Sequence, residues 1–300
     1  MGEVRYDGKV AIVTGAGGGL GRSHAMLLAS RGAKVVVNDL GGAADGSGKG
    51  SAMADKVVDE IKAAGGVAVA NYDGVNTMEG GKNIVKTAID NFGKVDIVIN
   101  NAGILRDKSF VKMDEQSWDM VISVHLKGAF CVTHAAFPYM KENNYGRIVM
   151  TASGAGIFGN FGQTNYGAAK TALIGFMNVL KLEGMKYNIK VNTIAPIAAS
   201  RMTENLMPPE MLAKLGPEYV SPIVAYLCSE DCRETGGIFT VGGGHYGRIS
   251  VMEGTGITLS GAVTVDDIKK NFDVINSMDG AKYFPTINDE TGSFIGQVLK

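Results

Sequence analysis

Short runs rich in β-branched residues alternate with longer, helix-compatible stretches along most of this chain. The runs cover residues 9–14, 33–39, 67–73, 95–100, 147–151, 190–195 and 238–241, and the helical stretches cover 20–31, 51–64, 77–92, 115–142, 165–187 and 217–229. Most of the runs are almost continuously apolar, as strands of a parallel sheet are when helices cover both faces. The alternation therefore predicts an α/β fold of the Rossmann type, with a doubly wound parallel sheet of seven strands.

Two segments interrupt this alternation. Residues 41–50 (GGAADGSGKG) form a Gly-rich insertion between the second strand and its helix, and no further strand–helix unit follows residue 245. Beyond it we predict one short helix, over residues 265–278, among polar turns. We therefore expect a dinucleotide-binding domain over residues 1–245. Residues 246–300 would be a C-terminal extension that packs on the same domain or on a partner subunit.

Composition excludes several classes of function. The formal net charge is −1, so there is no basic field to attract nucleic acid or an acidic membrane surface. The three cysteines lack the spacing of a zinc site, and we expect free thiols and no metal. The chain shows no signal region and no apolar run approaching the ~18 residues of a membrane span. A cytoplasmic protein is expected.

The first predicted strand leads directly into a glycine-rich turn, residues 14–22 (TGAGGGLGR), where the next helix begins. Gly15 permits the tight turn, Gly19 allows the backbone to approach a pyrophosphate, and Gly21 allows the helix to pack closely on the strand. The helix N-terminus then offers amide donors to the phosphates. A lone glycine pattern is weak evidence, but its position after a buried strand favours a dinucleotide site.

Asp39 ends the second predicted strand. A carboxylate at this position can accept hydrogen bonds from both hydroxyls of the adenosine ribose, and it repels a 2′-phosphate. Because Leu40 and Gly41 follow it rather than an arginine, the sequence favours NAD over NADP. The ends of the next two strands supply the other candidates: Asp73 toward the adenine, and Asn101, which could brace the fold or line the cofactor groove. The predicted cofactor-binding residues are Gly15, Gly19, Leu20, Gly21, Asp39, Asp73, Gly74, Asn101, Ala102, Gly103, Tyr166, Lys170 and Pro196.

The fifth predicted strand leads into Ser153, and Tyr166 and Lys170 follow further along the chain, one helical turn apart. A phenol with a pKa of about 10 is a poor base at neutral pH, and a nearby cation lowers that pKa by favouring the phenolate. Tyr166 could then take the proton of a substrate hydroxyl or donate one to a carbonyl. Ser153 would bind the substrate oxygen, and Lys170 could also hold the nicotinamide ribose.

Taken together, the glycine turn, residues 100–103 (NNAG), Ser153, the Tyr166/Lys170 pair and the loop at Pro196 resemble the short-chain dehydrogenase/reductase family over about residues 8–245. The resemblance implies NAD-dependent interconversion of a secondary alcohol and a ketone. Further segments are similar to one branch of that family, the (3R)-hydroxyacyl-CoA dehydrogenase unit of type 2 multifunctional enzymes, also described as 17β-hydroxysteroid dehydrogenases, and its stand-alone bacterial relatives. These segments are the insertion, residues 71–73, 103–107, 159–163, 200–203 and 290–293.

What this branch implies is more specific. The expected substrate is a (3R)-hydroxyacyl-CoA, oxidised to the 3-ketoacyl-CoA, with a 17β-hydroxysteroid as the alternative and Met202–Met211 as an adaptable lid. A homodimer or homotetramer is implied, with residues 115–142 and 165–187 as packing faces and the tail acting over a partner's active site. A peroxisomal location is implied only within a larger eukaryotic multifunctional enzyme.

Three positions depart from the general family pattern. Family members often carry an asparagine where this chain has His125, which is expected to replace it as a fourth catalytic residue, holding a proton-relay water; ordinary helix packing is the alternative. Ile197 follows Pro196 where glycine is usual, which affects substrate fit. The chain also continues past residue 245. A redox sensor without turnover is disfavoured because Tyr166 and Lys170 are both retained, and the glycine spacing disfavours a sugar epimerase.

Overall fold

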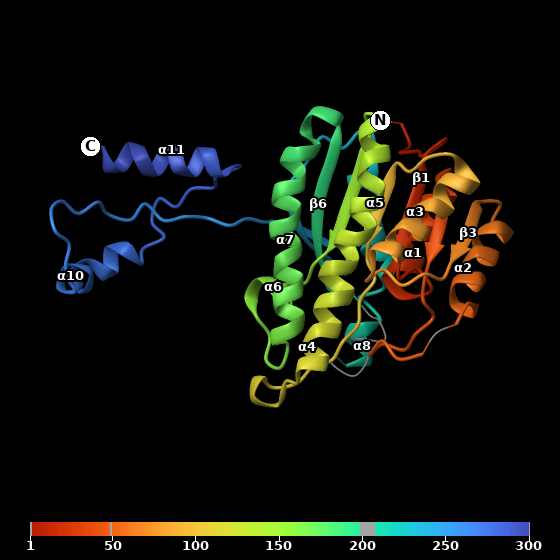
Figure 1. Cartoon of the computed structure of the whole chain (residues 1–300), viewed down its shortest axis with the longest axis horizontal. Coiled ribbons are helices and arrows are strands. Elements are labelled where there is room, and N and C mark those ends of the chain that lie inside the picture. Colours follow the sequence, from red (N-terminus) through yellow and green to blue (C-terminus); the bar gives the residue numbers. More distant parts are fainter. Residues whose placement is uncertain (1, 49, 199–207, 300) are drawn as a thin grey trace. The chain divides into compact units, whose positions relative to one another are not determined.

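The computed structural model describes residues 2–48, 50–198 and 208–299. Within this part of the chain, eight strands form one sheet in the order β3-β2-β1-β4-β5-β6-β7-β8 (Figure 1). The strands are β1 (Val10–Thr14), β2 (Lys34–Asn38), β3 (Val67–Asn71), β4 (Ile97–Asn100), β5 (Gly146–Thr151), β6 (Ile189–Pro196), β7 (Ile238–Gly242) and β8 (His245–Ile249). The pairs from β3 through β7 are all parallel. The predicted doubly wound α/β sheet is therefore confirmed.

The eighth strand differs from the seven predicted. Only Gly243 and Gly244 separate β7 from β8, and a connection of two residues joins antiparallel strands, never parallel ones. Residues 245–249 thus extend the sheet instead of beginning the tail. Strand β8 follows β7 without an intervening helix, so the alternation of strands and helices did not predict it.

Helices cover both faces of the sheet. Those described are α1 (Gly19–Ser30), α2 (Ala52–Ala63), α3 (Met78–Phe92), α4 (Glu115–Ile122), α5 (Gly128–Glu142), α6 (Gly154–Phe158), α7 (Thr164–Gly184), α8 (Pro209–Leu212), α9 (Ser221–Cys228), α10 (Val265–Ile275) and α11 (Ile287–Val298), with single 3-10 turns at Phe110–Lys112, Met185–Tyr187 and Pro217–Tyr219 and a π-helix at Ser123–Lys127. Helix α1 contacts α2 and α9. Helix α5 contacts α3, and α7 contacts α4 and β6 (Figure 1). Side chains of β1, β2 and β4 join those of α1, α2 and α9 in one buried core.

Among the described helices, the stretch Glu115–Glu142 is long and apolar enough, by length and composition alone, to cross a membrane. The sequence did not lead us to expect such a segment. Its apolar character has a different origin, because Cys131, Val132 and Ala136 of α5 are completely buried within the domain. A core helix of an α/β domain meets the same criteria.

Two compact units divide the chain, residues Met1–Arg248 and Ile249–Lys300. The second unit has no buried residue in its described part. Its helices α10 and α11 each begin with a reciprocal capping box, at Thr264 with Asp267 and at Thr286 with Asp289. Helix α10 falls within the predicted 265–278, whereas α11 was expected to be a polar turn.

The strand order locates the ligand-binding edge. Strands β2 and β3 follow β1 on one side, and β4 returns to pair with β1 on the other, so the order reverses between β1 and β4. In open α/β sheets, ligands bind beyond the carboxyl ends of the strands at such a switch point. The glycine turn after Thr14 and the segment after Asn100 both lie there.

Candidate active site

The glycine turn combines close packing at two positions with open space at a third. Gly15 has φ +63°, and a Cβ at Gly21 would lie 2.2 Å from the carbonyl oxygen of Gly15. Side chains at these two positions would therefore separate the turn from the helix. By contrast, a Cβ at Gly19 (φ +51°) would meet no atom within 4 Å, so this backbone faces open space. The N-cap of helix α1 is Gly18, which has no side chain to cap the helix and leaves its first amides available to an anion.

Asp39 is held beside this turn by two backbone amides. Gly17 N donates to Oδ2 and Gly41 N donates to Oδ1, each at 2.7 Å. The half-buried carboxylate is thereby fixed, and each oxygen retains a lone pair for a hydroxyl donor. A cofactor with a ribose diol fits this pair of acceptor oxygens, whereas a phosphate there would meet a fixed negative charge.

Asp73 and Asn101 take part in the framework of the same edge. The carboxylate of Asp73 accepts hydrogen bonds from the amides of Asn71 (2.8 Å) and Asn83 (3.1 Å). The amide of Asn101 donates to the carbonyls of Thr14 (3.0 Å) and Gly15 (3.1 Å). Of the two roles considered for Asn101, the structure therefore shows the bracing one, because both of its amide hydrogens hold the glycine turn.

The remaining predicted cofactor residues lie at the same edge. Ala102 N donates to the hydroxyl of Thr14 at 3.1 Å, Gly74 follows β3, and Pro196 is the last residue of β6. The segment after it, residues 199–207, lies outside the described residues, and with it most of the proposed Met202–Met211 lid. The loop at Ile197 and Ala198 is described, and Ile197 is 48% exposed.

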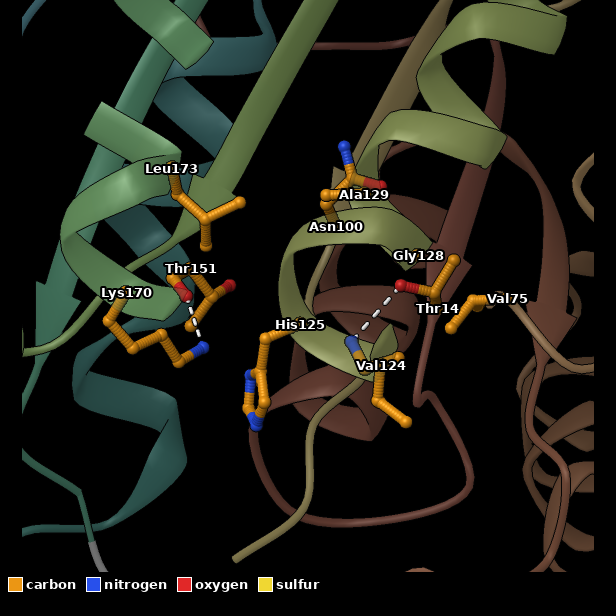
Figure 2. A pocket seen from close by; sticks show the side chains of 11 residues that line it. Thr14, Val75, Asn100, Val124, His125, Gly128, Ala129, Thr151, Lys170 and Leu173 are labelled. Carbon is orange, nitrogen blue, oxygen red and sulfur yellow. Dashed lines mark hydrogen bonds between the residues drawn. The ribbon is translucent and has the colours of Figure 1, made fainter. Parts of the chain in front are cut away.

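Ser153, Tyr166 and Lys170 come together as the sequence predicts. Ser153 caps α6 just after β5, with its hydroxyl accepting from Ala155 N at 3.2 Å, and its hydroxyl acts to lower the pKa of Tyr166. Lys170 lies one turn beyond Tyr166 on α7, and its Nζ is 5.4 Å from the centre of the tyrosine ring. That ammonium donates to the carbonyl oxygen of Thr151, the last residue of β5 (Figure 2).

The electrostatics of the pair differ from the expectation. Burial raises the pKa of Tyr166, and the hydrogen bond from Ser153, rather than the charge of Lys170, acts to lower it. Burial also lowers the pKa of Lys170 to about 7, because the side chain is only 4% exposed. The expected lowering of the phenol's pKa by the nearby cation is therefore not found, because Lys170 is not among the groups that shift the pKa of Tyr166. Both groups are desolvated, and desolvation favours the neutral form of each.

His125 lies in the π-helix between α4 and α5, and this irregular turn directs its ring at the site. Its Nε2 is 3.0 Å from Ile104 N and 2.8 Å from Ile104 O, and its ring meets that of Tyr166 edge-on at 5.2 Å. Burial, and next the charge of Lys170, hold the pKa of His125 well below its usual value, so the imidazole is neutral. A Cβ at Gly103 would lie 2.4 Å from its Cε1, so only glycine fits there.

A cavity of about 10 Å³ is lined by His125, Lys170 and side chains from the neighbouring strands and helices (Figure 2). Among the described residues, four buried side-chain atoms have no hydrogen-bond partner, and three of them belong to residues that line this cavity: Asn100 Oδ1, His125 Nδ1 and Thr151 Oγ1. Lys170 lines it as well. A space of this size, with two to four polar neighbours, is what a single buried water needs.

Comparison with known proteins fits this geometry. The family model for the short-chain dehydrogenases matches residues 9–210. A short-chain type dehydrogenase/reductase of Mycobacterium tuberculosis is 54% identical over 274 residues, which cover 91% of this chain and 96% of the relative. The chain belongs to the short-chain dehydrogenase family. It is therefore an oxidoreductase, and its family uses a nicotinamide cofactor.

Two solved structures extend the likeness. The full-length peroxisomal multifunctional enzyme type 2 of Drosophila melanogaster matches with a TM-score of 0.85 and 42% identity, over 99% of this chain and 50% of that one. A 7α-hydroxysteroid dehydrogenase, complexed with NADH and 7-oxo glycochenodeoxycholic acid, matches with a TM-score of 0.71 and 31% identity, over 80% of this chain and 95% of that one. The chain spans only 65% of the Dictyostelium multifunctional enzyme A and 40% of the mouse type 2 enzyme.

Sequence reasoning missed one polar residue of this dehydrogenase site. Asn165 is completely buried; its amide donates to the carbonyls of Arg106 (3.1 Å) and Ser117 (3.2 Å), and its Oδ1 accepts from Tyr166 N at 2.7 Å. The sequence signal that could have identified it is its position directly before the candidate catalytic tyrosine.

No group of three metal-ligating side chains occurs among the described residues, where Cys131, Cys228 and Cys232 are buried free thiols.

Proposed function

We propose that this dehydrogenase oxidises (3R)-hydroxyacyl-CoA to 3-ketoacyl-CoA with NAD. The observation that carries the reaction is the grouping of three side chains: Ser153 acts on the pKa of Tyr166, and the buried Nζ of Lys170 lies 5.4 Å from the centre of the tyrosine ring. The acyl-CoA substrate is supported by similarity to multifunctional enzymes named hydratase-dehydrogenase-epimerase, including 50% identity over 290 residues with that of Neurospora crassa.

The chain's own residues account for the proton chemistry. Ser153 binds the substrate oxygen, and Tyr166, as phenolate, accepts the hydroxyl proton while the carbon–hydrogen bond breaks. NAD, when bound, supplies the acceptor for the hydride. In the reverse direction Tyr166 is the acid, and the burial that raises its pKa keeps it protonated at neutral pH. Lys170 lies within reach of Tyr166 and holds the end of β5 through Thr151.

The preference for NAD rests on Asp39. Its carboxylate is fixed by Gly17 and Gly41 at the end of β2, and no arginine follows it. Asp39 would hold the ribose hydroxyls, the open backbone at Gly19 and the first amides of α1 would hold the pyrophosphate, and Asp73 would face the adenine. The NADH complex of the related 7α-hydroxysteroid dehydrogenase supports this assignment.

The role expected of His125 also follows from the cavity. We propose that a water held by Asn100, His125 and Thr151 carries protons toward Lys170, with the neutral imidazole as a hydrogen-bonding partner rather than a charged one. Replacement of His125 by phenylalanine should then slow proton release and leave cofactor affinity unchanged.

A rim of exposed apolar side chains supports an apolar substrate. Phe158 ends the short helix that starts at Ser153, and it is 77% exposed; Phe161, five positions before Tyr166, is 90% exposed. Phe110 (73%) and Val111 (90%) lie on the neighbouring segment, which Lys108 N joins to Gly162 O at 2.9 Å. Such a rim suits an acyl chain. It suits a flat steroid as well, so a 17β-hydroxysteroid remains the second candidate.

The test is a substrate panel with the purified protein. NADH should form from (3R)-hydroxyacyl-CoA, and Tyr166→Phe should abolish it, while Tyr226→Phe, an exposed tyrosine on α9, should retain full activity. Equal activity of the Tyr166 and Tyr226 variants would refute the assignment. Higher kcat/KM for estradiol than for the acyl-CoA would select the steroid instead.

Assembly and location belong to the same proposal. We infer a homodimer or homotetramer that packs through α5 and α7, where Phe130, Val179 and Leu182 are exposed. The exposed apolar residues of α10 and α11 (Ile268, Phe272, Ile287, Phe294 and Val298) support a C-terminal extension that packs on its own domain or on a partner subunit, over the partner's active site. Deletion of residues 250–300 should lower both the activity and the mass of the assembly in solution.

The proposed location is the cytoplasm, or the peroxisome within a larger eukaryotic multifunctional enzyme.

A further inference from the structure

The Gly-rich insertion, residues 41–50 without the undescribed residue 49, is a closed turn. Gly50 N donates to Leu40 O at 2.9 Å, which joins its two ends. Inside it, Ala43 N donates to Ser47 O at 2.7 Å, and the carboxylate of Asp45 accepts from Ser47 N at 2.9 Å. The insertion therefore has a defined backbone on which other groups can rest.

Its outer end rests on the segment that follows β4. Leu105 N donates to Ala44 O at 3.0 Å, and Arg106 Nε donates to Asp45 O at 2.9 Å. A Cβ at Gly46 would lie 3.2 Å from the side chain of Ile104. Three consecutive residues, 104–106, thus touch the insertion.

The other side of the same segment holds the catalytic residues. Ile104 is bound to the ring of His125 at 2.8–3.0 Å, and the carbonyl of Arg106 accepts from Asn165, which in turn accepts from Tyr166 N at 2.7 Å. One residue further on, Asp107 accepts from Gln163 at 2.6 Å. The bonds of Arg106 and Asp107 fix the start of α7, where the N-cap Gln163 makes no side-chain cap of its own.

We propose that the insertion is a positioning element for Tyr166 and that Arg106 is the residue through which it acts. Arg106 joins the insertion through its guanidinium and Asn165 through its carbonyl, so one residue links the loop to the start of the catalytic helix. The base of the insertion is Gly41, whose amide donates to Asp39. A ligand that engages Asp39 would stabilise the insertion and, through Arg106, the backbone at Tyr166. This last step rests on the proposed binding of the adenosine half of the cofactor at Asp39.

The amide of Tyr166 reports directly on this arrangement, because it donates to Asn165. In the ligand-free protein, Arg106→Met should speed hydrogen–deuterium exchange at that amide roughly fivefold, the effect of losing about one hydrogen bond. Arg106→Lys, which retains a donor toward Asp45, should restore most of the protection. Lys112→Met on the neighbouring 3-10 turn is the matched control and should leave the exchange unchanged.

Adenosine monophosphate tests the link to Asp39 without any turnover. It should slow exchange at Tyr166 in the wild type and in Arg106→Lys, but not in Arg106→Met, although all three bind it. In turnover assays Arg106→Met should lower kcat roughly fivefold with little change in the KM for NAD.

Exchange at Tyr166 that is the same in Arg106→Met and in the wild type, with and without the nucleotide, would overturn the proposal. A protein that does not bind adenosine monophosphate would contradict the cofactor assignment instead, and the ligand-free comparison would still decide whether Arg106 positions Tyr166.

Discussion

Replacement of Lys170 by methionine should inactivate this dehydrogenase and stabilise its fold. Lys170 is 4% exposed, its ammonium donates to the carbonyl of Thr151, and no carboxylate among the described residues pairs with it. Burial lowers its pKa from 10.5 to about 7. A buried cation without a counter-charge is costly, and methionine fills a similar volume without one.

The magnitude follows from that pKa. Below about pH 7 the ammonium is charged in both states, and the gap between the two pKa values costs the folded state roughly 5 kcal/mol at about 1.4 kcal/mol per pH unit. Methionine removes this cost but leaves the Thr151 carbonyl without its donor, which costs about 1–2 kcal/mol. We expect a net gain of about 3 kcal/mol in the free energy of unfolding at about pH 6.

The dependence on pH is the sharper test. Between about pH 7 and 10.5 the unfolded state binds more protons at Lys170 than the folded state, so the wild type gains stability as the pH rises. The advantage of Lys170→Met should therefore shrink across this window, reach zero near about pH 9 and reverse above it, where only the loss of the hydrogen bond to Thr151 remains. Urea unfolding of both proteins at a fixed protein concentration, from about pH 6 to 9.5, measures it. Lys62→Met, at an exposed position of α2, should show no such trend. A difference that stays constant with pH, or a less stable Lys170→Met at pH 6, would refute the reasoning.

Three further changes test other parts of the site. Asp39→Asn should lower the ratio of kcat/KM for NAD over NADP about tenfold, because it removes the charge that repels a 2′-phosphate; an unchanged ratio in steady-state assays would contradict this. Gly103→Ala places a methyl 2.4 Å from His125 and should cost about 1–3 kcal/mol in unfolding experiments, whereas Gly175→Ala, with nothing within 4 Å, should cost nothing. Because burial raises the pKa of Tyr166, the rate of alcohol oxidation should rise toward alkaline pH. Ser153→Ala removes a group that lowers this pKa, so the rise in the pH–rate profile should shift to higher pH.

Local sequence pattern predicted seven of the eight described strands and residues that lie together at one edge of the sheet. The apolar runs placed seven strands within about two residues of their ends, because a strand buried on both faces has no polar position to obscure it. Ser153, Asp39 and the glycine turn were placed for a related reason. Each lies directly after a strand, and the carboxyl ends of parallel strands share one edge.

What the pattern could not supply depends on contacts between distant segments. Whether a phenol next to a lysine is acidic depends on the burial of both groups, which is decided by α4, α5 and β5, not by their spacing on α7. The π-helix that turns His125 inward has no local signature, and its partner Ile104 lies 21 residues away. Helix α11, by contrast, could have been predicted from the sequence, because Thr286 and Asp289 have the spacing of the capping box that they form.

The cost of catalysis is concentrated in a small part of the molecule. Three of the four buried side-chain atoms without partners among the described residues, and the buried cation of Lys170, surround one cavity of about 10 Å³. The fourth is Nε2 of His24, which lies on α1 and not at this cavity. The Nδ1 of the same ring is 2.8 Å from Ser221 Oγ, and burial lowers the pKa of His24 to about 3. A fold selected only for stability would fill such a space with apolar side chains. Asn100, His125 and Thr151 instead maintain polar groups around Lys170, so the sheet and the helices on both its faces must supply the stability that this site removes.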